Sequence, residues 1–462
     1  MSRLPRSLIV GLCLVVVGCS AGTPGPSAPA GEPIRIGAVF PLGGSAAGLA
    51  GHELRGVEIA ADLVNADGGI GGRPVQLEVR DLQSGADAPA VMASLRREGI
   101  QAVIGAYGSD LSIAASQAAD AAGLVYWEAG AVADRLTGRG LPMVFRVGAT
   151  GSNLGSNSAA FAATELASRL GRAKTDLRVA IVSADDTYAA SVADAAAATS
   201  ASFEMPVVAR ATYSLVIPDW SSLMDELAQA RPDVIILASH IPDGIAFRQA
   251  MVRAGLRVGA LIGSTMAECD PDFAGELGRD AVGIFASDRP TAGFRPTALG
   301  AEAAAAYARF ATAWGAAAAE VGGGGDTPGG GRGGYGQDGD AEYTIHGPAE
   351  QATAEESEEA LAGFSAAWAL FAHVLPAVLG GAPAAASQPS AQAVAAAARA
   401  VDLPEGSLPN GAGVRFSSDP DRLGQNERAA AVIWQWQAVR RYEFVWPPSY
   451  ATGDVAFVPL DR

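Results

Sequence analysis

Between residues 34 and 262, short apolar runs alternate with segments whose apolar positions recur every three or four residues. Short apolar or alternating runs bounded by turn-forming residues predict strands, and the longer recurrence predicts amphipathic helices. The connections between them are short, which is typical of a parallel α/β sheet. The strands that this pattern predicts are residues 34–40, 75–79, 102–104, 124–127, 144–147, 177–183, 206–211, 233–238 and 260–262.

One stretch, Gln101–Ala131, contains two of these strands and the helix between them. Each strand runs into small, turn-forming residues, Gly105–Ser109 after the first and Ala129–Ala131 after the second. In open parallel sheets, ligands bind outside the carboxyl ends of the strands, and here two such ends lie side by side. The sequence therefore predicts a ligand site at this edge, faced by a second edge of the same kind.

The alternation of strand and helix restarts after Gly148, which predicts two successive lobes. We expect an α/β fold with two Rossmann-like parallel-sheet lobes joined by a multi-strand hinge. The first lobe is expected to contain residues 33–148 and 283–400, and the second lobe residues 149–282 and 401–462. Chain crossings near residues 145–148, 282–286 and 400–415 would form the hinge.

The first 18 residues have the pattern of an export signal. Two arginines precede the apolar run Leu8–Val17, which is far shorter than the ~20 residues that a membrane-spanning helix needs. The sequence VVGC ending at Cys19 resembles the lipobox of bacterial lipoproteins, so we expect residues 1–18 to be a signal peptide and Cys19 to carry lipid. The alternative is an ordinary signal peptide with an incidental cysteine. Residues 19–32, rich in Pro, Gly and Ser, would form a flexible tether between the cell membrane and an extracytoplasmic domain.

Charge, cysteine content and local composition bear on nucleic-acid binding, disulfide bonds and disorder. The formal net charge of −17 argues against nucleic-acid binding, which needs basic patches. If Cys19 is lipidated and the signal peptide is removed, Cys269 is the one cysteine left, so no intramolecular disulfide is expected. Residues 322–357 are first rich in Gly and then acidic, with few large apolar residues, and we expect them to be a disordered insertion in the first lobe.

Ser109 is a candidate anion-binding residue because it lies where the helix after the first strand of Gln101–Ala131 begins. Free N–H groups at a helix start, together with a hydroxyl group, suit a carboxylate. Ser109 or Asp110 would serve equally well as a simple helix cap, because capping and ligand binding use the same atoms.

Aromatic and acidic residues gather at the same edge. Tyr107, Tyr126 and Trp127 could pack on the apolar face of a ligand, although Tyr126 and Trp127 point to opposite sides of a strand, so at most one faces the cleft. Glu128 could accept a hydrogen bond from an ammonium or amide group, or it could be a solvated loop carboxylate.

In the second lobe, Asp185, Asp186, Thr187 and Tyr188 follow one strand, and His240 follows another. Of these, Tyr188 is the best candidate for a contact that closes over a ligand. No second His or Cys lies at metal-ligand spacing from His240, so no metal site is expected. The sequence has no G-x-S-x-G, H-E-x-x-H or P-loop motif and no G-x-G-x-x-G after the first strand, and neither an enzymatic activity nor a cofactor is expected.

The chain resembles the branched-chain amino-acid-type substrate-binding proteins of ABC importers, which have the type I periplasmic-binding-protein fold. The resemblance extends over most of residues 33–290 and rests on IRIGAVFPLGG, GVEIAADLVNADGGIGGRPVQLEVRDLQS, AVIGAYGS, DDTYAAS and FRQAMVRAGL. It implies that the solute's carboxylate lies at the loops Tyr107-Gly108-Ser109 and Gly130-Ala131-Val132, with further contacts at Tyr188, His240 and Thr265.

The sequence departs from the family pattern at three places. The family often has an aromatic residue where Leu49 stands, a Thr that helps to hold an ammonium group where Val132 stands, and Ser-Pro where Glu128-Ala129 stand. Because Val132 cannot accept a hydrogen bond, we expect either that Glu128 replaces the lost acceptor or that the ligand is an amide, a urea-like compound or another small polar metabolite.

These features predict a monomeric, lipid-anchored protein that captures a small polar solute between two lobes and delivers it to an ABC permease. Two alternatives remain at this stage. The chain could be a sensor that transmits closure to a signalling partner, or an extracytoplasmic hydrolase, which would need a nucleophile and a base within hydrogen-bonding reach in the cleft.

Overall fold

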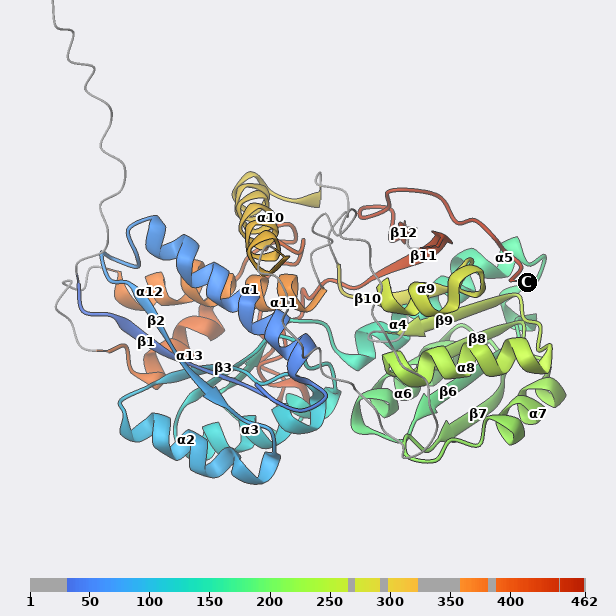
Figure 1. Cartoon of the computed structure of the whole chain (residues 1–462), viewed down its shortest axis with the longest axis horizontal. Helices are drawn as coiled ribbons and strands as arrows, with labels where there is room; N and C mark the ends of the chain where they lie inside the picture. The colour runs from blue at the N-terminus through green and yellow to red at the C-terminus, as the bar shows by residue number, and fades with distance from the viewer. Residues whose placement is uncertain are drawn as a thin grey trace, which may run out of the picture.

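The computed structural model describes residues 31–264, 271–290, 298–322, 358–380, 388–439 and 441–460. The expected signal peptide, Cys19, nearly all of the tether, Thr265 and the body of the expected insertion lie outside the described residues. The described chain forms two lobes side by side, with the blue N-terminal elements in one and the green elements in the other (Figure 1).

The first lobe is built on a five-stranded parallel sheet with the order β2-β1-β3-β4-β5. Its strands are β1 (Ile34–Phe40), β2 (Val75–Asp81), β3 (Ala102–Gly105), β4 (Val125–Glu128) and β5 (Val144–Arg146). Side chains of successive strand residues reach opposite faces: Ile104 belongs to the core beneath one set of helices and Val103 to the core beneath the other.

Helices cover both faces of this first sheet. The helices α2 (Ala88–Arg97) and α3 (Ser109–Ala121) pack against one face. The other face is covered by α1 (Ala47–Ala66), α11 (Glu358–Trp368) and α13 (Ala391–Ala400), and α10 (Ala301–Gly322) lies against α1. Residues far apart in the sequence therefore complete one core, as the orange helices beside the blue ones show (Figure 1).

The second lobe contains a seven-stranded sheet with the order β12-β11-β10-β9-β8-β6-β7. Its strands are β6 (Val179–Ala184), β7 (Val207–Tyr213), β8 (Val234–Ala238), β9 (Ala260–Ser264), β10 (Phe285–Asp288), β11 (Val432–Ala438) and β12 (Arg441–Trp446). The strands from β6 to β10 are parallel to their neighbours, and β11 and β12 pair antiparallel.

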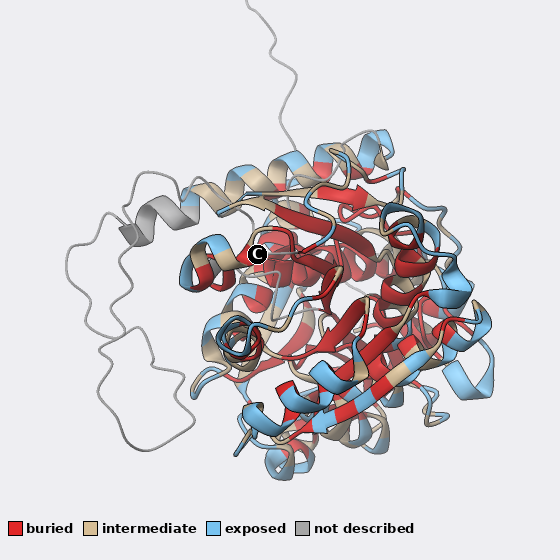
Figure 2. Ribbon diagram, turned by 90° about the vertical axis from the view of Figure 1, so that its right-hand side faces the viewer, coloured by how far each residue is buried: buried red, intermediate tan, exposed pale blue. Residues whose placement is uncertain are grey.

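The helices of the second lobe also lie on both faces of its sheet. One face is covered by α4 (Gly151–Phe161), which continues through a π-helical turn into α5 (Ala167–Arg169), and by α6 (Thr187–Ser202). The helices α7 (Trp220–Ala230) and α8 (Ile241–Ala254) cover the other face, and α9 (Pro271–Leu277) packs against α8. Seen end-on, buried strands fill the centre of this lobe and the outer sides of the helices are exposed (Figure 2).

One strand lies in a different sheet from the one the sequence predicted. Residues 283–400 were expected in the first lobe, but β10 pairs with β9 and β11 and therefore extends the second sheet. The physical reason is that β10 pairs in parallel with β9 and antiparallel with β11, with Trp434 opposite Ala286, and a local sequence pattern does not reveal such pairing. The return to the first lobe therefore begins after Asp288. Apart from this, the division of the chain into lobes remains a prediction.

The helices α1 and α11 cross at unusually short distance because glycines meet there. A Cβ atom on Gly56 would lie 2.0 Å from the carbonyl oxygen of Ala360, and one on Gly363 would lie 2.0 Å from that of Glu53. Only glycine permits this approach. The α11 helix continues through a π-helical turn into α12 (Leu375–Leu379), and the segment Glu358–Leu379 is long and apolar enough to cross a membrane. Its most apolar window is 72% buried inside the fold, as expected for a core helix.

A fully buried arginine, Arg146, lies where the chain crosses from β5 to α4 and donates hydrogen bonds to neighbouring segments. The Arg146 guanidinium donates to the side-chain oxygen of Gln425 at 2.6 Å and to the carbonyl oxygens of Ala131 and Ala133 at 3.2 and 2.6 Å. Burial lowers its pKa to about 10, although the carboxylates of Asp134 and Glu128 act in the opposite direction. Arg146 therefore joins two of the crossing segments to the loop after β4.

Candidate functional site

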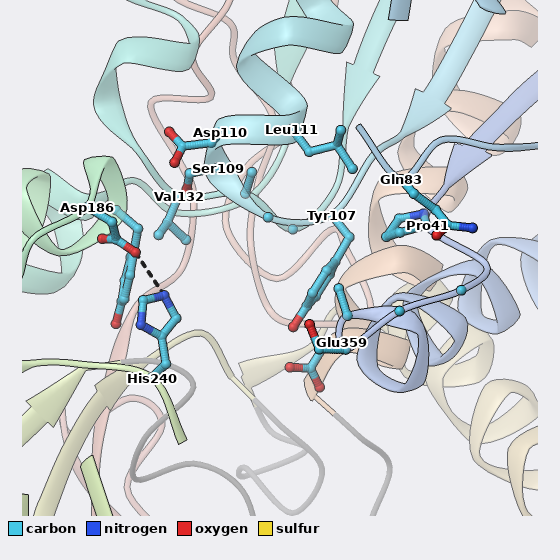
Figure 3. Close-up of a pocket in the computed structure, with 18 of the residues that line it drawn as sticks. Pro41, Gln83, Tyr107, Ser109, Asp110, Leu111, Val132, Asp186, His240 and Glu359 are labelled. Atoms are coloured by element: carbon cyan, nitrogen blue, oxygen red, sulfur yellow. Dashed lines mark ion pairs between the residues drawn. The ribbon is translucent and has the colours of Figure 1, made fainter. Parts of the chain in front are cut away.

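A cavity of about 410 Å³ lies where the carboxyl edges of the two sheets face each other (Figure 3). Residues from both lobes line it. The first lobe contributes Pro41, Gly43, Gly44, Ser45 and Ala46 after β1, Gln83 after β2, Tyr107, Gly108, Ser109, Asp110 and Leu111 after β3, and Gly130, Ala131 and Val132 after β4. The remaining lining residues are Asp186, Tyr188 and His240 from the second lobe, Arg289 after β10, and Glu359 at the start of α11.

The sheet topology explains why the cavity forms there. In the first sheet the chain moves from β1 to one side and then returns to the other side through β3, so the order reverses between β1 and β3. In the second sheet the same reversal falls between β6 and β8. Loops diverge at such reversals and leave a crevice at the carboxyl ends of the strands. The loops after these four strands all line the cavity.

The loop after β3 presents Tyr107 in an unfavourable backbone conformation. Its φ of 78° lies in the left-handed region, which is unfavourable by about 1–3 kcal/mol for a non-glycine residue and is often retained at functional sites. The side chain is 7% exposed, and its hydroxyl group has no hydrogen-bond partner in the described structure. Burial, together with the carboxyl groups of Glu359 and Glu53, holds the pKa of Tyr107 well above its ordinary value, so the hydroxyl group stays protonated.

Ser109 does not cap the helix that it begins. The N-cap of α3 is Gly108, without a side-chain cap, and the Ser109 hydroxyl oxygen instead accepts a hydrogen bond from the Ala133 N–H at 3.2 Å. Ser109 therefore connects the loop after β3 to the loop after β4, and the first three residues of α3 line the cavity.

Two residues predicted to contact the ligand lie behind the cavity wall instead. Trp127 is fully buried and donates from Nε1 to the carbonyl oxygen of Ala366 at 2.8 Å, because a parallel sheet covered by helices on both faces buries both sides of β4. Glu128 is also fully buried and accepts hydrogen bonds from the N–H groups of Gly130 and Ala131 at 3.0 and 2.8 Å. The Glu128 side chain thus stabilises the loop after β4 and is not among the residues that line the cavity.

Any residue other than glycine at position 130 would require the Glu53 side chain to move. A Cβ atom there would lie 1.9 Å from a carboxyl oxygen of Glu53, which projects from α1 directly behind the loop. Glu53 is fully buried and neither of its oxygens has a hydrogen-bond partner in the described structure. Burial, and next to it the charge of Glu128, raises the pKa of Glu53 well above its ordinary value.

On the opposite wall, Tyr188 and His240 pack edge to face, with ring centroids 5.2 Å apart. The Tyr188 hydroxyl group donates to the carbonyl oxygens of Ser239 and Ser264, at the ends of β8 and β9. His240 pairs through Nε2 with Asp186 at 2.9 Å (Figure 3). Burial alone would lower the pKa of His240, but the hydrogen bond and charge of Asp186 outweigh it and raise that pKa. The pair thus favours a protonated imidazole beside a carboxylate.

The sequence did not reveal a buried ionic group at the base of the cavity. Arg289 pairs with Glu358, and its Nη1 donates to the carbonyl oxygen of Gly130 at 2.8 Å. Burial works against the charge of Arg289, but the nearby carboxylates of Glu358, Asp288 and Glu359 raise its pKa above the ordinary value. Glu358 and Glu359 directly follow residues 322–357, which were expected to be an insertion. Two acidic residues directly before an apolar run are a helix-start signal, and that signal would have assigned them to α11.

Of the residues predicted to bind the ligand, eight line the cavity: Tyr107, Gly108, Ser109, Gly130, Ala131, Val132, Tyr188 and His240. Trp127 and Glu128 do not, and Thr265 lies outside the described residues. Within the described residues, no group of three or more His, Cys, Asp or Glu side chains could hold a metal ion. The loop Pro41–Ala46 was missed, although the reversal between β1 and β3 would have indicated it once the strand order was known.

Comparisons with known proteins agree on one family. The family model described as periplasmic binding protein matches residues 33–325. A curated relative, Leu/Ile/Val-binding protein homolog 8 of Brucella abortus (strain 2308), is 30% identical over 426 residues, which is 92% of this chain and 93% of the relative. Homolog 7 of Brucella melitensis is 30% identical over 260 residues, covering 55% of this chain and 64% of the relative.

Solved structures show the same fold at lower identity. The branched-chain amino acid transporter substrate binding protein LivJ of Streptococcus pneumoniae, in complex with isoleucine, aligns with a TM-score of 0.65 and 18% identity, over 90% of this chain and 100% of that one. A putative branched-chain amino acid ABC transporter protein of Silicibacter pomeroyi aligns with a TM-score of 0.68 and 19% identity, over 93% and 100%. These likenesses confirm the predicted α/β fold with two parallel-sheet lobes.

Proposed function

The chain belongs to the periplasmic binding protein family, among the substrate-binding proteins of branched-chain amino acid ABC transporters, and on that premise we propose that it captures an amino acid or a similar small polar solute between its lobes and delivers it to an ABC permease. The family consists of solute-binding proteins and not of enzymes. The observation that carries the proposal is the cavity of about 410 Å³, because it lies at the facing carboxyl edges of two sheets and is lined from both. Its size falls within the ~300–1,000 Å³ of ordinary small-molecule sites.

The names of the relatives support an amino acid as the solute. The curated relatives are Leu/Ile/Val-binding protein homologs, and two of the similar solved proteins are described as complexes with isoleucine and with Leu. In the proposed site, the free N–H groups at the start of α3 and the loop Gly130–Val132 receive the solute's carboxylate. Tyr188 and His240 then contact it from the second lobe.

Closure of the lobes is the proposed mechanism. The crossings after β5 and after β10, together with a third crossing ahead of β11, form the hinge about which the lobes rotate. The solute drives closure only because it contacts both walls and so binds the closed state more tightly than the open one. The permease then recognises the closed form.

For localisation, we propose an extracytoplasmic protein anchored by lipid on Cys19, since the lipobox-like sequence precedes a tether rich in Pro, Gly and Ser. A single acyl chain gives only marginal binding, so stable anchoring needs more than one chain on this cysteine. Cys19→Ala should move the protein from the membrane fraction to the soluble fraction. Equal partition of parent and variant would contradict the anchor without affecting the solute-binding proposal.

A thermal-shift screen tests the proposed function directly. The purified protein is heated with single amino acids, amides, urea and short polyols, because a ligand that binds the folded state alone raises its melting temperature. We expect at least one amino acid or amide to raise it in a dose-dependent way, with a stoichiometry of one by calorimetry. No shift with any of these compounds would contradict the proposal.

A further inference from the structure

We propose that Asp134 is a positioning residue for solute binding, because its side chain holds the loop after β4 to the second lobe and so stabilises the arrangement in which the two lobes enclose the cavity. This loop comprises residues 130–134, and Gly130, Ala131 and Val132 of it line the cavity. Asp134 is not among the lining residues, so its effect on binding passes through the loop. The role of Asp134 rests on the proposed function, to which it adds a contact that favours closure.

The first support is the contact between Asp134 and the start of α4. One carboxylate oxygen of Asp134 accepts a hydrogen bond from the Ser152 N–H at 3.0 Å, and the other accepts one from the Ser152 hydroxyl group. Ser152 is the second residue of α4, and the first N–H groups of a helix have no partner within the helix. A negative charge at this end of a helix is also stabilised by the helix dipole. The contact therefore joins a loop of the first sheet to a helix of the second lobe.

The second support is the backbone beside Asp134, which makes two further hydrogen bonds to the second lobe. The N–H of Gly151, the first residue of α4, donates to the carbonyl oxygen of Val132 at 2.6 Å. The N–H of Asp134 donates to the hydroxyl oxygen of Ser191 in α6 at 3.2 Å. The short 3-10 turn that begins at Asp134 also packs against α6. The loop after β4 is thus bound to two helices of the second lobe.

The same loop is also bound to the first lobe. Its Ala133 N–H donates to the hydroxyl oxygen of Ser109 in α3, and Arg146 of β5 donates to two of its carbonyl oxygens. Because the loop is bound to both lobes, rotation of one lobe relative to the other must break or deform one of the two sets of hydrogen bonds. Arg146 is fully buried, whereas Ser152 is exposed, so water can replace the bonds between Asp134 and Ser152. We therefore expect the lobes to separate at this contact.

Such a contact changes the affinity for a solute without touching it. A hydrogen bond that is present in one arrangement of the lobes and absent from the other stabilises the first relative to the second. The apparent affinity for a solute rises with the fraction of molecules that already have the binding arrangement. Removal of the Asp134 carboxylate should therefore increase the population of separated lobes and weaken solute binding, although every residue that lines the cavity is kept.

Asp219 provides a matched control within the same chain. Its carboxylate accepts hydrogen bonds from the Ser222 N–H at 3.1 Å and from the Ser222 hydroxyl group at 2.7 Å, at the start of α7. These are the same two kinds of bond that Asp134 makes, but both partners belong to the second lobe. Asp134→Ala and Asp219→Ala thus remove equivalent contacts from a helix start. A change in the arrangement of the lobes that Asp134→Ala alone produces does not come from the loss of a helix cap.

Double electron–electron resonance on the protein without solute compares the variants, with spin labels at Gln117 of α3 and Arg253 of α8 in a Cys269→Ser background. We expect Asp134→Ala to raise the ratio of long to short distances about fivefold, the usual effect of removing a helix-capping carboxylate. Asp219→Ala should leave the distribution of the parent unchanged. Circular dichroism melts verify that each variant folds. Ser191→Ala, which removes the acceptor of the Asp134 N–H, should shift the distribution in the same direction and decides the question if Asp134→Ala does not fold.

A distribution for Asp134→Ala that coincides with that of the parent, or an equal shift in Asp219→Ala, would overturn the role of Asp134. Calorimetry with L-leucine and L-isoleucine adds a second readout: Asp134→Ala should bind them about fivefold more weakly than the parent, and equal affinity would also overturn the role. If neither amino acid binds to the parent, the distance measurement alone decides. Failure of the proposed function is a different outcome, in which no compound of the wider screen binds while the distance change in Asp134→Ala remains.

Discussion

Arg289 donates from Nη1 to the carbonyl oxygen of Gly130 at 2.8 Å. This hydrogen bond joins the end of β10 in the second sheet to the loop after β4 in the first sheet, which lines the cavity. Arg289 immediately follows β10, where the chain leaves the second sheet. Its other partner, Glu358, begins a helix that packs across α1. The chain crossing and the cavity wall are therefore one connected structure, so that rotation at this crossing would move the wall as well.

Removing the guanidinium group should destabilise the fold strongly. Arg289→Met leaves the Glu358 carboxylate buried without its partner, which typically destabilises a protein by about 3–5 kcal/mol. Urea unfolding followed by circular dichroism measures the difference. The matched control is Arg422→Met, which removes an exposed pair with Asp419 and should change stability by less than about 0.5 kcal/mol. Equal effects of the two substitutions would contradict the role given to Arg289.

Substitution by alanine at two glycines of α1 should change the stability of the fold in opposite directions. Gly56→Ala places a methyl group where the Ala360 carbonyl oxygen lies, and overpacking of this kind destabilises by about 1–3 kcal/mol. Gly48→Ala places it in open space on the same helix and should stabilise by about 0.5–1 kcal/mol. Chemical denaturation of both variants measures the two signs. A neutral Gly56→Ala would show that α1 and α11 do not touch as described.

The raised pKa of the buried Glu53 carboxyl group predicts how the stability of the fold depends on pH. Its pKa is raised in the folded state, so its contribution to stability is fully present below the ordinary value of 4.5 and is lost as the pH rises through the raised pKa. Glu53→Gln removes that loss. The stability of the variant relative to the parent should therefore increase between pH 5 and pH 8, by about 1–3 kcal/mol, the usual penalty for a buried polar group without a partner.

Denaturation at a series of pH values measures this difference, with Glu276→Gln as the exposed control. If the difference between Glu53→Gln and the parent is constant from pH 5 to pH 8, Glu53 does not titrate as the structure implies.

The two walls of the cavity should contribute separately to binding. Ser109→Ala removes the bond to the Ala133 N–H on one wall, and Tyr188→Ala removes the ring that lies against His240 on the other. Each should weaken binding of the solute found in the screen about tenfold, or ~1.4 kcal/mol, without unfolding the protein. Calorimetry on each variant measures the loss. Unchanged affinity in both would remove these residues from the site.

The fold was largely predictable because its signals are local. The apolar run at 102–104 and the small residues after it suffice to predict β3 and the loop that follows. A chain crossing was also predicted at 282–286, where β10 lies, but its sheet was wrong, since the pattern of a strand does not show that it pairs with β9 and β11. Pairing between distant segments leaves no periodic pattern in either of them.

The site was predictable only in part, because sequence does not show where a side chain at a strand end points. Tyr107 follows β3 and Glu128 ends β4 of the same sheet, yet Tyr107 lines the cavity and Glu128 turns inward to accept hydrogen bonds from two backbone N–H groups. Glu359 was missed for another reason: it ends an acidic segment, and its burial depends on α11 docking against α1.

Capture of a solute by closure of the two lobes is tested most directly by a distance measured across the cavity. Spin labels at Gln117 of α3 and Arg253 of α8, both exposed, are placed in a Cys269→Ser background, and double electron–electron resonance is recorded with and without the solute identified in the screen. The account predicts that solute shortens and narrows the distance distribution. A solute that binds by calorimetry yet leaves the distribution unchanged would contradict it.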